Sequence, residues 1–90
     1  MDKIVINAKP VRFSKVTVIK DDAVKEVVNA MSKDLPDIVM TMSKTYNINA
    51  ILIAGPESYT NQLGFQINNA NKTMFSKEPR KISIEYIKGV

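Results

Sequence analysis

The chain has 90 residues, a length that allows one domain and no second. It contains no Cys, His or Trp, which excludes disulfides, thiolate or imidazole chemistry and a histidine pH switch. Its 13 basic and 9 acidic residues leave a net charge of +4, and its 44% hydrophobic content is typical of a folded globular protein.

The first two elements are predicted to form a hairpin of strands. Residues 3–8 are rich in β-branched side chains, and Ile4 and Ile6 share one face. Pro10 cannot donate to a strand ladder, so the chain turns there. Residues 15–20 are predicted as the second strand, paired with the first.

Two helices are predicted next. Asp21 and Asp22 favour the start of a helix, because acidic side chains cap helix N-termini and interact well with the helix dipole. The apolar residues that follow fall on one face at 100° per residue, which predicts a helix over 23–33. Pro36 suits the first turn of a second helix over 35–46.

The last three elements are predicted as strand, helix and strand. Residues 50–54 are apolar at every position, the pattern of a strand buried on both faces. Pro56 favours the start of a helix that continues to Met74. Strict alternation over 82–87 predicts a half-buried strand near a sheet edge.

These elements predict one small α/β domain over residues 1–90 with the order β-β-α-α-β-α-β. We expect a four-stranded mixed sheet in which strands 2–4 are parallel and strand 1 is antiparallel to strand 2. The stretch from Lys15 to Ile87 resembles many small α/β units. The order of the elements is similar to part of a ribonuclease H-like fold, in which a hairpin precedes alternating helices and strands. That family carries a catalytic carboxylate on its first strand. Residues 3–8 contain no acidic residue, so the resemblance implies no nuclease activity.

The predicted topology gathers charges at the two ends of the sheet. Parallel strands start at the same edge, so six basic residues preceding or opening strands 2 and 4 are expected to meet there: Lys9, Arg12, Lys15, Lys77, Arg80 and Lys81. Such an edge could contact a phosphate backbone, which makes a nucleic-acid-binding module one alternative function. Asp21, Asp22 and Glu57 are expected at the opposite edge, where we interpret them as helix caps and predict no metal site.

A further alternative is a small enzyme that handles phosphates or nucleotides. Gly55 and Ser58 lie between a buried strand and a helix, the place of a phosphate loop. The segment lacks the further glycines of a dinucleotide-binding motif and the Lys of a P-loop. A tight turn from strand to helix also explains it.

Two apolar residues, Met40 and Phe65, point away from the apolar stripes of their predicted helices. Together with the strand over 50–54, they predict a partner-binding surface. If all helices cover one face of the sheet, the other face is left bare and another chain, including a second copy of this one, would cover it. If the helices divide between the faces, no partner is needed.

Our leading interpretation is a non-enzymatic binding or regulatory protein that acts through protein–protein contacts, as a homo-oligomer. The missing Cys and His remove the usual nucleophile and acid–base sets, so we predict no catalytic residue and no cofactor. The abundance of Lys, Ile and Asn fits an accessory protein of a phage or another mobile element. No signal peptide or membrane span is visible, so we expect a cytoplasmic location and no membrane partner.

Overall fold

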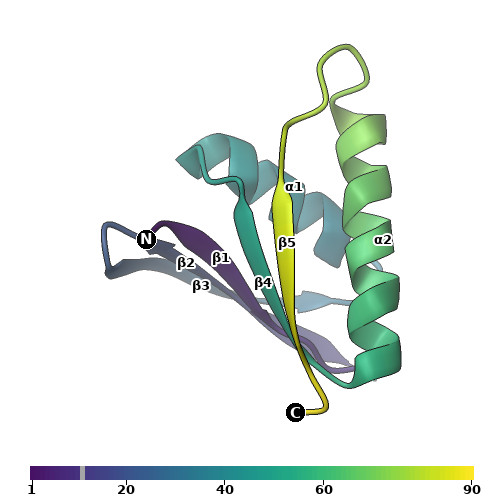
Figure 1. Cartoon of the computed structure of the whole chain (residues 1–90). Coiled ribbons are helices and arrows are strands. Elements are labelled where there is room, and N and C mark those ends of the chain that lie inside the picture. Colours follow the sequence, from purple (N-terminus) through teal and green to yellow (C-terminus); the bar gives the residue numbers. More distant parts are fainter. Residues whose placement is uncertain (11) are drawn as a thin grey trace.

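Three antiparallel strands begin the chain (Figure 1). In the computed structural model, which describes residues 1–10 and 12–90, β1 (Lys3–Asn7) pairs with β2 (Phe13–Lys20), and β2 pairs with β3 (Ala23–Met31). The predicted hairpin is thereby confirmed. The helix predicted over 23–33 is wrong, because these residues form the third strand.

The turn between β2 and β3 explains the first part of this error. Asp21 and Asp22 have φ angles of 54° and 61°, both in the left-handed region. A two-residue hairpin turn of type I′ requires positive φ at both positions, and Asp tolerates it better than most residues. The two carboxylates therefore mark a tight hairpin rather than a helix N-terminus.

A bulge explains the second part. Val18 is aligned with Glu26 and Ile19 with Val24, so β3 carries one extra residue, Lys25. The bulge brings Val24 and Val27 to the same face of the sheet although they are three residues apart, which is the spacing of a helix stripe. β-branched valines pack well in a strand, and pairing with β2 decides the outcome.

Among the described residues, the sheet has five strands in the order β3-β2-β1-β4-β5, not four. β4 (Ala50–Gly55) lies parallel to β1, and β5 (Ser83–Lys88) lies parallel to β4. The strands predicted as 2, 3 and 4 correspond to β2, β4 and β5. The prediction that β2 is parallel to the other two is wrong, because β2 is antiparallel to β1 and β1 is parallel to β4. Because β3 reverses the chain once more, the connection into β4 leaves from β3 rather than from β2.

Two helices cover one face of this sheet. α1 (Leu35–Tyr46) packs over β2 and β3, while α2 (Glu57–Met74) packs over β4 and β5. Asn47 ends α1 with a left-handed φ of 52°, so the helix has the bounds predicted for it, 35–46. In the part of the chain that the structure describes, neither helix is long and apolar enough to cross a membrane.

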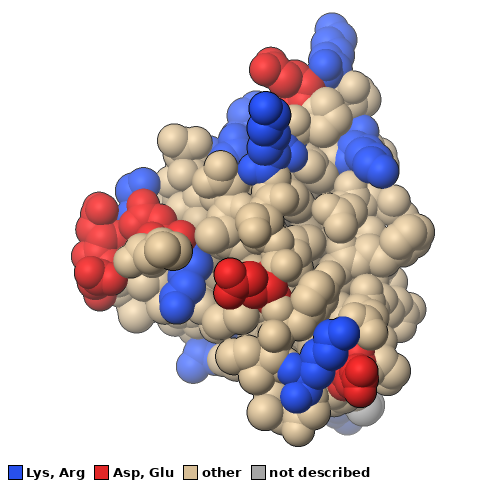
Figure 2. Space-filling model, viewed as in Figure 1, with Lys and Arg blue, Asp and Glu red and all other residues tan. Residues whose placement is uncertain are grey.

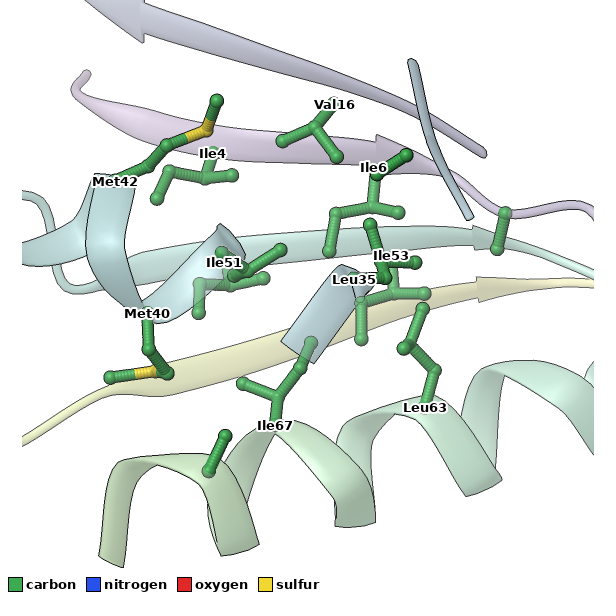
Figure 3. Packing of buried hydrophobic residues seen from close by; sticks show 14 of the residues in the cluster. Ile4, Ile6, Val16, Leu35, Met40, Met42, Ile51, Ile53, Leu63 and Ile67 are labelled. Atoms are coloured by element: carbon green, nitrogen blue, oxygen red, sulfur yellow. The ribbon is translucent and has the colours of Figure 1, made fainter. Parts of the chain in front are cut away.

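The core lies between the helices and this face of the sheet (Figure 3). The central strands contribute alternate residues, so that Ile4, Ile6, Ile51 and Ile53 are at most 2% exposed. Leu63 and Ile67 of α2 point toward the sheet in Figure 3. The other main contributors are Val16, Val18, Leu35, Val39, Met40 and Met42. With both helices on one side, no described part of the chain forms a layer over the opposite face of the sheet.

Candidate interaction surfaces

The uncovered side of the sheet carries apolar side chains on all five strands, with polar and charged residues among them. It carries the residues that alternate with the core residues of each strand, and we call it the open face. Its large apolar side chains are Val5, Phe13, Ile19, Val24, Val27, Met31, Leu52 and Ile87. Of these, Phe13 is 52% exposed, Val24 62% and Ile87 47%. The strand over 50–54 is therefore covered by helices on one face only, contrary to the expectation of burial on both.

Residues aligned across the strands form rows on the open face. One row runs through Val27, Thr17, Val5, Leu52 and Glu85, from β3 to β5. The next row contains Lys15 on β2, aligned with Asn29 and Asn7. The open face thus carries an acidic group toward its β5 side and a basic group toward its β3 side. A second basic residue, Lys3, lies on the central strand β1, where it is aligned with Ile19.

The two residues predicted to contact a partner do not form one surface. Met40 is 0% exposed and packs in the core, so the prediction that it faces a partner is wrong. It belongs to the core cluster that residues of α1, α2 and the sheet share, and the apolar stripe of its helix alone did not predict this burial. Phe65 is 66% exposed on α2, in the helix layer and away from the open face.

The six basic residues predicted to meet are divided between the two ends of the sheet. Lys9 and Arg12 lie between β1 and β2, at the end where β1 and β4 finish. Lys15 lies near that end, aligned with Asn7. Lys77, Arg80 and Lys81 precede β5, whose first residue is aligned with the first residue of β4 at the opposite end. The expectation of one basic edge is wrong because β2 is antiparallel to β4.

The acidic residues are divided as well. Asp21 and Asp22 form the β2–β3 turn, at the end where β1 starts, whereas Glu57 opens α2 beyond the end of β4. The Asp2 carboxylate accepts a 2.7 Å hydrogen bond from the backbone N–H of Asp21 and lies 3.6 Å from the Lys20 ammonium. The hydrogen bond first, and then the Lys20 charge, hold the pKa of Asp2 below its usual value. Among the described residues, no group of acidic side chains is arranged to hold a metal ion.

A hollow of about 810 Å³ lies at the α2–β5 loop. We call it the basic pocket; its lining is Lys44 of α1 together with Met74, Phe75, Ser76, Lys77, Glu78, Pro79, Arg80 and Lys81. Figure 2 shows basic side chains gathered around this loop at the top of the view, with one acidic group among them. The Lys44 ammonium lies 5.2 Å from the centre of the Phe75 ring, within cation–π range.

Arg80 is the anchored residue of the basic pocket. Its Nε donates a 3.0 Å hydrogen bond to the Ser43 hydroxyl near the end of α1. The Asn71 side chain accepts from the backbone N–H of Arg80 at 2.9 Å and donates to its carbonyl at 2.6 Å. Ser43 is fully buried and Asn71 nearly so, which fixes the guanidinium at the pocket wall.

Of the five basic or aromatic residues in the described lining of this pocket, sequence reasoning named three and missed Lys44 and Phe75. Lys44 lies in the last turn of α1, and Phe75 follows the end of α2. α1 precedes β4 and α2 precedes β5, and these two strands are parallel. The C-terminal ends of both helices therefore lie at the end of the sheet where β4 and β5 begin. Correct strand directions would have placed Lys44 and Phe75 beside Arg80.

The Gly55–Ser58 segment is a close-packed turn from β4 to α2. A Cβ at Gly55 would lie 2.7 Å from the Ala8 carbonyl oxygen, so close backbone packing explains the glycine. Ser58 lines a different hollow with Lys33 and Tyr59. Gly55 does not line that hollow, so the two residues predicted to bind phosphate do not share it.

No protein-family description matches the sequence, and a search of curated proteins gives no match. Among solved structures, the chain is similar to Pelota from Archaeoglobus fulgidus, with a TM-score of 0.53 and 12% sequence identity. The superposition covers 99% of this chain but 27% of that one, so the chain spans about a quarter of the length of the Pelota chain. At this identity, the likeness is one of fold alone.

Proposed function

We propose that the protein is a non-enzymatic binding protein that acts through protein–protein contacts, and that a second copy of the same chain covers its open face. The uncovered apolar face of the sheet carries this proposal. Exposed apolar surfaces of such breadth mark sites of interaction in soluble proteins. A regulatory or accessory role in a mobile element stays a prediction from the composition.

The dimensions of the molecule support a dimer. It measures 32 × 29 × 19 Å, and the short dimension corresponds to a sheet with one layer of helices. A stable protein interface needs about 800 Å² from each partner. The broad side of the molecule is large enough to supply this area. Stacking two such sheets would give each one the second covering layer that it lacks.

The charges support a second copy in particular. A two-fold interface presents the same patch from both sides, so the patch must complement itself. A two-fold axis parallel to the strands and near β1 would set β5 of one protomer over β2 and β3 of the other. Glu85 of one protomer would then approach Lys15 of its partner, while apolar side chains such as Val5 and Leu52 meet between them.

Sedimentation velocity and light scattering on Leu52→Lys test this proposal. Leu52 lies near the middle of the open face and is aligned with Glu85, which could pair with the new ammonium within one protomer. We expect wild type to have twice the 10.1 kDa mass of one chain and the variant to be monomeric. Circular dichroism should show that the variant is still folded.

Phe65→Lys is the matched control, because it also places a lysine on an exposed apolar position, but in the helix layer. We expect it to keep the dimer. A wild-type protein that stays at 10.1 kDa at the highest attainable concentration would overturn the proposal. A Leu52→Lys protein that remains dimeric would equally exclude the open face as the interface.

A further inference from the structure

The basic pocket concentrates positive charge that the fold does not neutralise with carboxylates. Lys44, Lys77, Arg80 and Lys81 line one hollow, and Glu78 is the single acidic residue in the described part of its lining. Among residues 1–10 and 12–90, no carboxylate lies within salt-bridge distance of these cations. The C-terminal end of α1 offsets part of the repulsion, since helix C-termini favour cations. The hollow therefore keeps a net positive charge, which a bound anion would neutralise.

The guanidinium of Arg80 is held in place before any ligand arrives. The Ser43 hydroxyl accepts a 3.0 Å hydrogen bond from its Nε, and the Asn71 side chain is hydrogen-bonded to the backbone N–H and carbonyl of Arg80. The one further acceptor recorded for it in the described chain is the Asn47 side-chain oxygen, at 3.5 Å from Nη2. Several guanidinium donors therefore remain for a ligand. A guanidinium fixed by packing matches phosphate oxygens with little loss of conformational entropy.

An aromatic ring lies in the same hollow. Phe75 is half-buried against the core and lines the basic pocket beneath the Lys44 ammonium. Cations that follow a phosphate backbone, combined with an aromatic ring on which a base can stack, are the elements of single-strand recognition. A free phosphate ion would use the cations but would not contact the ring.

We propose that the basic pocket binds single-stranded nucleic acid, with phosphates at Lys77, Arg80 and Lys81 and one base against Phe75. This site is independent of the open face, which lies on the other side of the sheet from the helices. Its residues come from the α2–β5 loop and the end of α1. Recognition by backbone charge and stacking is tolerant of sequence, so we expect little preference among bases.

Fluorescence anisotropy with labelled oligo-uridylate and oligo-thymidylate of about 12 nucleotides tests the proposal. We expect wild type to bind both at about 50 mM salt, with an affinity that falls as salt rises. Lys77→Glu/Lys81→Glu should weaken binding about ten-fold or more. It should also lower the slope of log affinity against log salt by about 1.4, because each phosphate contact on a single strand contributes about 0.7.

Lys9→Glu/Lys33→Glu is the matched control. It changes the net charge equally, but both exposed lysines lie at the other end of the sheet. We expect it to retain the wild-type salt slope. Phe75→Leu should weaken binding about five-fold or more while circular dichroism confirms folding, since stacking on an aromatic ring is lost.

Three results would overturn the proposal. One is no binding by wild type at low salt. Another is equal loss of affinity in the two double variants, which would show an effect of net charge alone. The third is displacement of the oligonucleotide by ATP or pyrophosphate at the same phosphate concentration, which would identify a site for small phosphates.

Discussion

The hydroxyl of Tyr46 donates a 2.6 Å hydrogen bond to the carboxylate of Glu26. Tyr46 is the last residue of α1, and Glu26 lies on β3, a strand at one edge of the sheet. The bond therefore ties the helix layer to a strand that has one neighbour in the sheet. It also raises the pKa of Tyr46, chiefly because the ionised phenol would lose this hydrogen bond to a carboxylate.

Removal of this hydroxyl should change stability in a pH-dependent way. A raised pKa means that the folded state holds the phenol proton more tightly than the unfolded state. The contribution is therefore complete below the ordinary pKa of 10.0 and is lost as pH rises through the higher folded value. We expect Tyr46→Phe to lower the melting temperature near neutral pH, with a smaller difference from wild type in alkaline solution.

Glu26→Gln separates the charge from the contact in this experiment. The amide still accepts a hydrogen bond from Tyr46 but carries no charge to oppose ionisation of the phenol. We expect thermal melts of this variant to show less alkaline loss than wild type. An identical alkaline profile in wild type and both variants would contradict the assigned coupling.

The β2–β3 turn makes a prediction that distinguishes a hairpin from a helix start. Asp22 has a φ of 61°, which glycine adopts more easily than aspartate. We expect Asp22→Gly to raise the free energy of unfolding by about 0.5 kcal/mol in urea denaturation, as the left-handed strain is relieved.

Asp22→Pro provides the opposite control. Proline fixes φ near about −65°, which the first turn of a helix accepts and this turn cannot. We therefore expect a loss of about 3 kcal/mol or failure to fold. Tolerance of proline at this position would favour the helical interpretation over the hairpin.

Local patterns predicted most elements of this fold but not their directions. The apolar run of β4 and the Asn47 helix end needed only short-range information. The bulge at Lys25 could not be found this way, because it depends on pairing with β2. That one missed strand reversed the chain and changed the direction of every later element relative to β2.

The candidate surfaces followed the same division. The sequence located the cluster of Lys77, Arg80 and Lys81, because those residues are neighbours along the chain. Lys44 joins them only through the parallel alignment of β4 and β5, which long-range pairing decides. Likewise, the sequence left two alternatives for the open face, covered or uncovered by helices, and only the fold shows that α1 and α2 lie on the same side of the sheet.

Substitution by alanine can distinguish the core position of Met40 from the surface position of Phe65. Met40 is 0% exposed, so Met40→Ala should leave a cavity and lower the free energy of unfolding by about 2–5 kcal/mol. Phe65 is 66% exposed, and we expect Phe65→Ala to change it by about 0.5 kcal/mol or less. Urea denaturation measures both. A small effect at Met40 would contradict its position in the core.

Gly64 allows α2 to approach β5 at Tyr86. The atoms nearest to a Cβ built at Gly64 all belong to the Tyr86 ring and its hydroxyl, so an alanine there would displace the tyrosine. In a helix interior, alanine is favoured over glycine by about 1 kcal/mol, whereas overpacking costs about 1–3 kcal/mol. We expect Gly64→Ala to destabilise the wild-type protein because the steric term is larger.

The effect of Gly64→Ala on stability should change sign when the Tyr86 ring is absent. In a Tyr86→Ser background the helix propensity of alanine acts alone, and Gly64→Ala should stabilise the protein by about 1 kcal/mol. A double-mutant cycle in urea measures this difference as a coupling energy between the two positions. Equal effects of Gly64→Ala in both backgrounds would show that Tyr86 does not pack over Gly64. A reversal would identify this contact as what fixes the distance between α2 and the edge strand β5.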